Sequence, residues 1–108
     1  MTIYLAGPIS GDAGYKVKFA AVAAMIRKEA PDAKILNPGA LPEGMSRADY
    51  MAICLQMLMC ADLVVFLPGW RSSGGADVEK RLADYLRIRT VEVSAEALEK
   101  AMEELRHG

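Results

Sequence analysis

The sequence contains few of the side chains that bind metal ions or form disulfides. Its one histidine is His107, and its two cysteines are Cys54 and Cys60. Because the cysteines are six positions apart in a predicted helix, they point to different faces and are poorly placed for a disulfide. We therefore expect a chain that needs no metal ion and no cofactor and that works in the reducing cytoplasm.

Neither sign of charge is in excess, and long apolar runs are absent. Lysine and arginine number 13, aspartate and glutamate number 14, and the formal net charge is -1. Such a balance creates no broad field for nucleic acid or an anionic membrane, so neither is expected as a partner. No apolar run approaches the ~20 residues of a membrane span. No charged leader with a cleavage site follows Met1, so secretion is not expected either.

Predicted strands and helices alternate along the chain. With 108 residues, of which 53% are hydrophobic, we expect one domain spanning residues 1–108. The alternation predicts an α/β fold, in which a small parallel sheet of four to five strands is covered by helices on both faces. The predicted strands are 2–6, 33–36, 63–67 and 90–93, and the predicted helices are 15–30, 47–60, 75–87 and 94–106.

Residues 61–79 form the most informative segment, in which a buried strand leads through a small, polar loop into a helix. Ser72 or Ser73 can cap that helix, and the two glycines that follow let a ligand approach the main chain. Free N–H groups and the helix dipole favour an anion there, and Arg71 can add positive charge. Glu79, one to two turns into the helix, can point back toward the same crevice.

In a parallel α/β sheet, ligands bind at the carboxyl ends of the strands, near the switch in strand order. Three predicted loops leave such ends, at residues 7–12, 37–44 and 68–75. Each loop is rich in glycine, proline or small polar residues, as binding loops on a rigid scaffold often are. We expect the three loops to converge on one site.

Four short segments carry a recognisable pattern: YLAGPISG at residues 4–11, NP at 37–38, CAD at 60–62 and SGGADVE at 73–79. Together they resemble the nucleoside 2-deoxyribosyltransferase-like superfamily over residues 2 to about 90. The segment LPGW at 67–70 is most similar to a small branch common in phages and prophages, related to 2'-deoxynucleoside 5'-phosphate N-hydrolases. The resemblance implies a flavodoxin-like sheet, homodimers or higher homo-oligomers, and cleavage of the N-glycosidic bond of a small-molecule nucleoside or nucleotide.

In that superfamily a glutamate at the position of Glu79 attacks the anomeric carbon of the sugar, and the base leaves. A carboxylate suits this chemistry because the transition state resembles an oxocarbenium ion. Ser73 stands where transferases acting on free nucleosides tend to have aspartate, and a hydroxyl beside free N–H groups favours a 5'-monophosphate. Cys54 stands where characterised members have an aspartate. The expected substrate-binding residues are Tyr4, Gly7, Pro8, Ile9, Ser10, Asn37, Asp62, Trp70, Ser72, Ser73, Gly74 and Gly75.

Simpler roles are open for several of these residues. Glu79 can be a helix acid favoured by the dipole, and Ser73 a plain helix cap. Asp62 can anchor the start of a strand, and Trp70 can cover a loop or a subunit contact. A second functional hypothesis is a protein that binds or senses nucleotides with little or no turnover, which Cys54 favours. A third is an interaction domain without a ligand.

Overall fold

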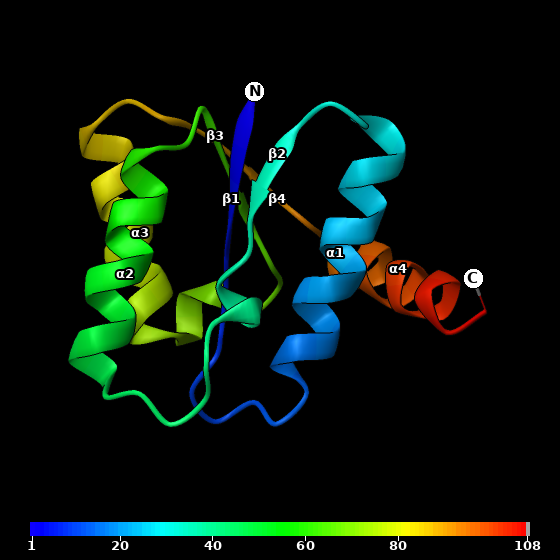
Figure 1. Ribbon diagram of the computed structural model, residues 1–108, viewed down its shortest axis with the longest axis horizontal. Coiled ribbons are helices and arrows are strands. Elements are labelled where there is room, and N and C mark those ends of the chain that lie inside the picture. The colour runs from blue at the N-terminus through cyan, green and yellow to red at the C-terminus, as the bar shows by residue number, and fades with distance from the viewer. Residues whose placement is uncertain (108) are drawn as a thin grey trace.

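The computed structural model describes residues 1–107 and contains a four-stranded parallel sheet with the order β2-β1-β3-β4 (Figure 1). The predicted α/β, flavodoxin-like fold class is confirmed, and each predicted boundary lies within two residues of the observed one. The elements are β1 (Thr2–Ala6), α1 (Tyr15–Glu29), β2 (Lys34–Leu36), α2 (Arg47–Met59), β3 (Leu63–Phe66), α3 (Gly74–Tyr85), β4 (Arg89–Glu92) and α4 (Ala95–His107), with short 3-10 turns η1 (Pro38–Ala40) and η2 (Trp70–Ser72).

Serine residues cap three of the helices. The hydroxyl of Ser46 accepts a hydrogen bond from the backbone N–H of Asp49 at the start of α2, and Ser94 caps α4 in the same way. Of the two candidates before α3, Ser73 is the cap, since its hydroxyl accepts from the N–H of Ala76 at 3.3 Å. Each bond satisfies an N–H that has no partner within its helix, which fixes where the helix begins.

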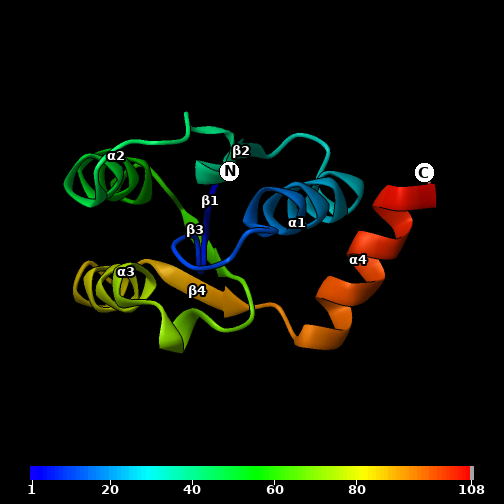
Figure 2. The same ribbon diagram turned by 90° about the horizontal axis from the view of Figure 1, so that it is seen from below.

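The sheet lies between two helical layers, with α2 and α3 on one face and α1 and α4 on the other (Figure 2). Side chains of β1 and β3 alternate between the two faces, so each face has its own apolar core. The first core contains Tyr4, Ala6, Cys54, Leu58, Val64, Phe66 and Ala83, and the second contains Ile3, Leu5, Phe19, Val22, Val65, Leu67 and Leu98. This alternation places the Tyr4 side chain under α2 and α3.

The chain order reverses at β1, because β2 pairs with one side of this strand and β3 with the other. The loops that leave the carboxyl ends of β1 and β3 therefore diverge toward opposite helical layers and leave a crevice between them. The start of α3 lies beside this crevice, because η2 connects it directly to the loop after β3. The topology thus brings distant parts of the chain to one edge of the sheet.

Cys54 is buried in α2 and Cys60 is exposed just after that helix, and both are free thiols, as their spacing predicted. None of the helices formed by residues 1–107 is long and apolar enough to cross a lipid bilayer. Residues 1–107 fold around one continuous sheet.

Gly7 follows β1, where the chain passes against the end of β3. A Cβ on residue 7 lies 2.8 Å from the Leu67 Cβ, an atom attached to the backbone that cannot rotate away. We therefore expect Gly7→Ala to lower the free energy of unfolding by about 1–3 kcal/mol in urea denaturation. At Gly14 a Cβ meets only an ordinary contact at 3.6 Å, so Gly14→Ala should change stability by less than about 0.5 kcal/mol. Equal losses in the two variants would contradict the steric explanation.

Candidate functional site

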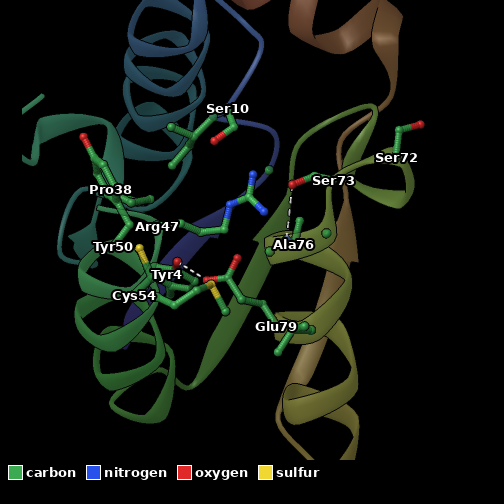
Figure 3. Close-up of a pocket in the computed structure, with 16 residues that line it drawn as sticks. Tyr4, Ser10, Pro38, Arg47, Tyr50, Cys54, Ser72, Ser73, Ala76 and Glu79 are labelled. Carbon is green, nitrogen blue, oxygen red and sulfur yellow. Dashed lines mark hydrogen bonds between the residues drawn. The ribbon is translucent and has the colours of Figure 1, made fainter. Parts of the chain in front are cut away.

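A pocket of about 440 Å³ opens at the carboxyl edge of the sheet (Figure 3). Its walls come from β1 and the loop after it, from η1, from α2, and from the junction of η2 and α3, so the predicted convergence of three loops is confirmed. The lining residues are Tyr4, Gly7, Ile9, Ser10, Pro38, Arg47, Tyr50, Met51, Cys54, Ser72, Ser73, Gly74, Gly75, Ala76, Val78 and Glu79. Nine of the predicted site residues, Glu79 among them, are in this set.

Glu79, Tyr4 and Cys54 come together at the floor of the pocket. Only 5% of Glu79 is exposed, although its carboxylate has no cationic partner among the salt bridges of residues 1–107. The Tyr4 hydroxyl donates a hydrogen bond to Oε2 of Glu79 across the space between β1 and α3. Cys54 reaches the same place from α2 (Figure 3). Glu79 is therefore more than a solvated acid near the start of a helix.

Burial determines the protonation of these three groups. It raises the pKa of the Glu79 carboxyl from 4.5 to about 7, and the hydrogen bond from Tyr4 opposes part of that rise. Burial, together with the charge of Glu79, also raises the pKa of Tyr4 far above its ordinary value, so its hydroxyl stays a hydrogen-bond donor. The pKa of Cys54 is raised mainly by burial, so this residue presents a neutral thiol. Glu79 is the group in this trio that titrates near neutral pH.

The start of α3 supplies the polar rim on one side of the pocket. Ser73 lines the pocket while capping the helix, so its two predicted roles are compatible in space. Gly74 and Gly75 belong to the first turn of α3, where backbone N–H groups have no partner within the helix. A Cβ at residue 74 would meet nothing within 4 Å, which shows how open the approach to this main chain is. The arrangement can bind an anion.

The opposite wall contains residues that the sequence interpretation missed. Pro38 and Tyr50 form an apolar and aromatic surface, and the Tyr50 hydroxyl donates to the carbonyl of Pro42 at 2.6 Å. Arg47, at the start of α2, extends into the pocket toward Ser10 and Ser73 (Figure 3). No sequence motif marked Arg47. The one available signal was a cation directly after a helix cap, where the helix dipole does not favour it.

Four predicted binding residues do not line the pocket. Asp62 lies before β3, at the amino edge of the sheet, and accepts a hydrogen bond from the Thr2 N–H at 2.8 Å. Asn37 caps η1 by accepting from the N–H of Gly39 at 2.8 Å. Pro8 is turned toward Gly69, where a Cβ would be 3.5 Å from its ring. These residues have structural contacts instead, and we remove them from the candidate site.

Trp70 is the fourth residue outside the pocket. The residue is 7% exposed, its ring packs against Phe66 with centroids 5.0 Å apart, and its Nε1 donates to Glu92 at 2.8 Å. Arg71 stacks on the outer face of the same ring and pairs with Glu92. Both side chains therefore brace the loop after β3 against β4. The expectation that Arg71 adds charge to the anion site is wrong, because its guanidinium is held on Trp70 and Glu92.

The pocket offers no evident set of metal ligands. Across residues 1–107, no three histidine, cysteine, aspartate or glutamate side chains are grouped closely enough to hold a metal ion. Asp49 in α2 and Asp77 in α3, two acids on the helices that wall the pocket, are not lining residues, and Asp77 pairs with Arg81. The polar side-chain groups that line the pocket are therefore one buried carboxyl group, one neutral thiol, several hydroxyl groups and one guanidinium.

Comparison with known proteins gives one family. A family model described as "Domain of unknown function (DUF4406)" matches residues 1–92, which include every element that lines the pocket. No curated protein and no solved structure matches the chain.

Proposed function

This chain belongs to the family of domains of unknown function DUF4406, and we propose that it cleaves the N-glycosidic bond of a nucleoside 5'-monophosphate with Glu79 as the nucleophile. The resemblance of residues 4–11, 60–62 and 73–79 to the nucleoside 2-deoxyribosyltransferase-like superfamily supports this proposal. The sugar is ribose or deoxyribose, and the acceptor of the sugar is water or a second base.

One observation carries the proposal: a buried carboxyl group and a rim with a hydroxyl and helix-start backbone N–H groups line the same pocket. Glu79 lies on the floor, where Tyr4 orients it, and Ser73 with the free N–H groups of Gly74 and Gly75 lies on the rim. A sugar phosphate has the matching chemistry, because its anomeric carbon and its phosphate are at opposite ends of one small ring. The pocket volume, about 440 Å³, is also within the ordinary range for small-molecule sites.

In the proposed reaction, a carboxylate oxygen of Glu79 forms a bond to the anomeric carbon while the bond from that carbon to the base nitrogen breaks. The base leaves with the electron pair and takes a proton from solvent. Water then attacks the anomeric carbon, loses a proton, and releases the sugar phosphate and the free carboxylate. Tyr4 holds the attacking carboxylate in place throughout, since its hydroxyl remains protonated. The wall of Pro38 and Tyr50 contacts the base.

The direct test is incubation of the protein with a panel of ribonucleoside and deoxyribonucleoside 5'-monophosphates, followed by chromatography for free base. We expect at least one monophosphate to release base, and its parent nucleoside to release it far more slowly. Absence of free base from every member of the panel would exclude cleavage of these substrates.

Activity should depend on pH through the carboxyl group of Glu79. A nucleophile must be ionised, so kcat/KM should rise with pH and level off above the Glu79 pKa of about 7. The measurement is base release at low substrate concentration between pH 5 and 9. An activity that is constant across this range, or that falls as pH rises through 7, would contradict the assignment of Glu79 as an attacking carboxylate.

Tyr4→Phe separates this titration from that of the substrate phosphate, whose second pKa is near 6. The hydrogen bond from Tyr4 lowers the pKa of Glu79, so its loss should move the rising limb to higher pH. The phosphate titration of the free substrate cannot move with this substitution. If the rising part of the pH profile stays at the same pH in Tyr4→Phe, it reflects ionisation of the substrate phosphate and not of Glu79.

Cys54 favours a second candidate function, nucleotide binding without turnover. A second acid normally assists the departing base, and the group that Cys54 supplies at the floor of this pocket is a neutral, buried thiol. A sensing protein would bind monophosphates in calorimetry with the same dependence on the rim residues, yet release no base from any of them. Calorimetry and chromatography on the same panel distinguish the two candidates.

A further inference from the structure

Arg47 has a position that the stability of the fold does not explain. It is the first residue of α2, directly after the Ser46 cap. A cation at this end of a helix opposes the helix dipole, which favours acids there. The Arg47 side chain is exposed, and in residues 1–107 its guanidinium takes part in none of the salt bridges. Local rules that are broken without a structural gain are expected at functional sites.

Arg47 is also the single lysine or arginine among the lining residues of the pocket. Figure 3 shows its guanidinium reaching from the α2 wall toward Ser10 and Ser73, above the floor that holds Glu79. The positive ends of two helix dipoles, those of α2 and α3, are directed at the same region. An anion bound there therefore meets an exposed cation on one side and backbone N–H groups on the other.

The arrangement of the hydrogen-bond donors around the pocket favours a tetrahedral anion. Hydroxyl, guanidinium and backbone N–H groups approach from three separate elements: the loop after β1, α2 and α3. A planar carboxylate is satisfied by one guanidinium fork, whereas a tetrahedral phosphate has oxygens for donors on several sides. We propose that Arg47 is the specificity-determining residue of this site, closing over the phosphate of a sugar 5-phosphate whose other end lies at Glu79. This inference rests on the proposed function for the orientation of the sugar.

Arg47 contacts the phosphate in this arrangement and not the reacting carbon, so it should act on binding. The loss of one charge-assisted, bidentate contact typically weakens affinity by about 10- to 100-fold. The Arg47→Gln variant should therefore raise KM for a nucleoside 5'-monophosphate by about this factor while changing kcat little. Arg47→Lys keeps the charge but not the fork, so it should recover part of the affinity.

The test uses ribose 5-phosphate and 2-deoxyribose 5-phosphate as probes in calorimetry, with ribose as the neutral reference. We expect Arg47→Gln to weaken binding of the sugar phosphates by about 10- to 100-fold and to leave the response to ribose unchanged. Arg71→Gln is the matched control, because Arg71 is in the neighbouring loop but is held on Trp70 and Glu92. That control should bind the probes as the original protein does.

A loss of folding in Arg47→Gln can be distinguished from the loss of its contact with the phosphate. Removing an exposed cation from the start of α2 should leave the melting temperature unchanged or slightly higher. Sugar-phosphate binding that is equally strong in Arg47→Gln, or equally weakened in Arg71→Gln, would overturn the inference.

The probes contain no glycosidic bond to a base, so this inference and the proposed reaction can fail independently. Binding that depends on Arg47, combined with no base release from any nucleotide, supports the inference and overturns the proposed reaction. Base release that proceeds equally well in Arg47→Gln from monophosphates supports the reaction and overturns the inference.

Discussion

Replacing Glu79 with glutamine is expected to reduce base release from the best monophosphate substrate by about 10⁴-fold or more. The amide has nearly the same shape and still accepts the hydrogen bond that Tyr4 donates to this side chain. It cannot, however, form the bond to the anomeric carbon or balance the positive charge that develops there. The measurement is kcat from chromatography of the free base, with calorimetry to show that sugar-phosphate binding is retained.

Two further variants decide what Glu79 does. Glu99→Gln removes an exposed carboxyl on α4, outside the pocket, and should leave kcat unchanged. Glu79→Ala leaves a space into which azide or formate can diffuse, and we expect these small nucleophiles to restore base release if the missing group attacked the sugar. Base release that persists in Glu79→Gln would assign the attack to another group.

The second large effect concerns stability, and it does not depend on any activity. Burial raises the pKa of Glu79 from 4.5 to about 7, so between these values the folded state keeps a proton that the unfolded state has lost. The free energy of unfolding should therefore fall as pH rises from about 4.5 to about 7, by about 3 kcal/mol, and change little through this group at higher pH. Below pH 4.5 both states are protonated and the contribution of Glu79 is constant.

Glu79→Gln isolates this contribution because the amide stays neutral at every pH. At pH 8 the variant should be more stable than the original protein by up to about 3 kcal/mol, and near pH 4.5 the two should be nearly equal. Urea denaturation at pH 4.5, 6 and 8 gives the difference directly. Glu99→Gln, an exposed carboxyl, is again the control and should follow the original protein at each pH. A variant that is less stable at pH 8 would show that the Glu79 carboxylate is well stabilised in the fold.

The two predictions describe opposite consequences of one arrangement. A carboxylate held in a mostly apolar pocket costs stability at neutral pH, and the same burial strengthens its interaction with a developing positive charge. A variant that is both more stable and inactive is the expected signature of a functional site. Arg47 is a smaller example of the same trade-off, because its charge opposes the α2 dipole while its side chain lines the pocket.

Much of the architecture can be predicted from the sequence, because it depends on residues that are close together in the chain. Ser46, Ser73 and Ser94 mark helix starts through bonds to N–H groups three residues later, which a sequence pattern can capture. The apolar run at 63–67, together with the alternation of predicted strands and helices, was sufficient to predict a parallel sheet with two covered faces. The position of Glu79, six residues after its cap, follows from the same local rules.

The role of an individual side chain at the edges of the sheet is much harder to predict from the sequence. Trp70 and Asp62 belong to family-like segments, yet one braces a loop against Glu92 and the other holds Thr2 at the far edge of the sheet. The resemblance marks Tyr4 as a binding residue but not as the donor to Glu79, and Arg47 looks like an ordinary surface residue. Which of them meets Glu79 depends on strand order and helix packing.

The sequence by itself determined the α/β class, the order of the elements, the approximate helix starts and, through the resemblance, the candidate nucleophile. Only the tertiary structure decided that Tyr4 donates to Glu79, that burial moves the pKa of this carboxyl to about 7, and that Arg47 enters the pocket. The physical reason is how far apart in the chain the interacting groups lie. Caps, periodicity and turns arise from groups a few residues apart, whereas desolvation and the contacts of a pocket depend on every element packed around it.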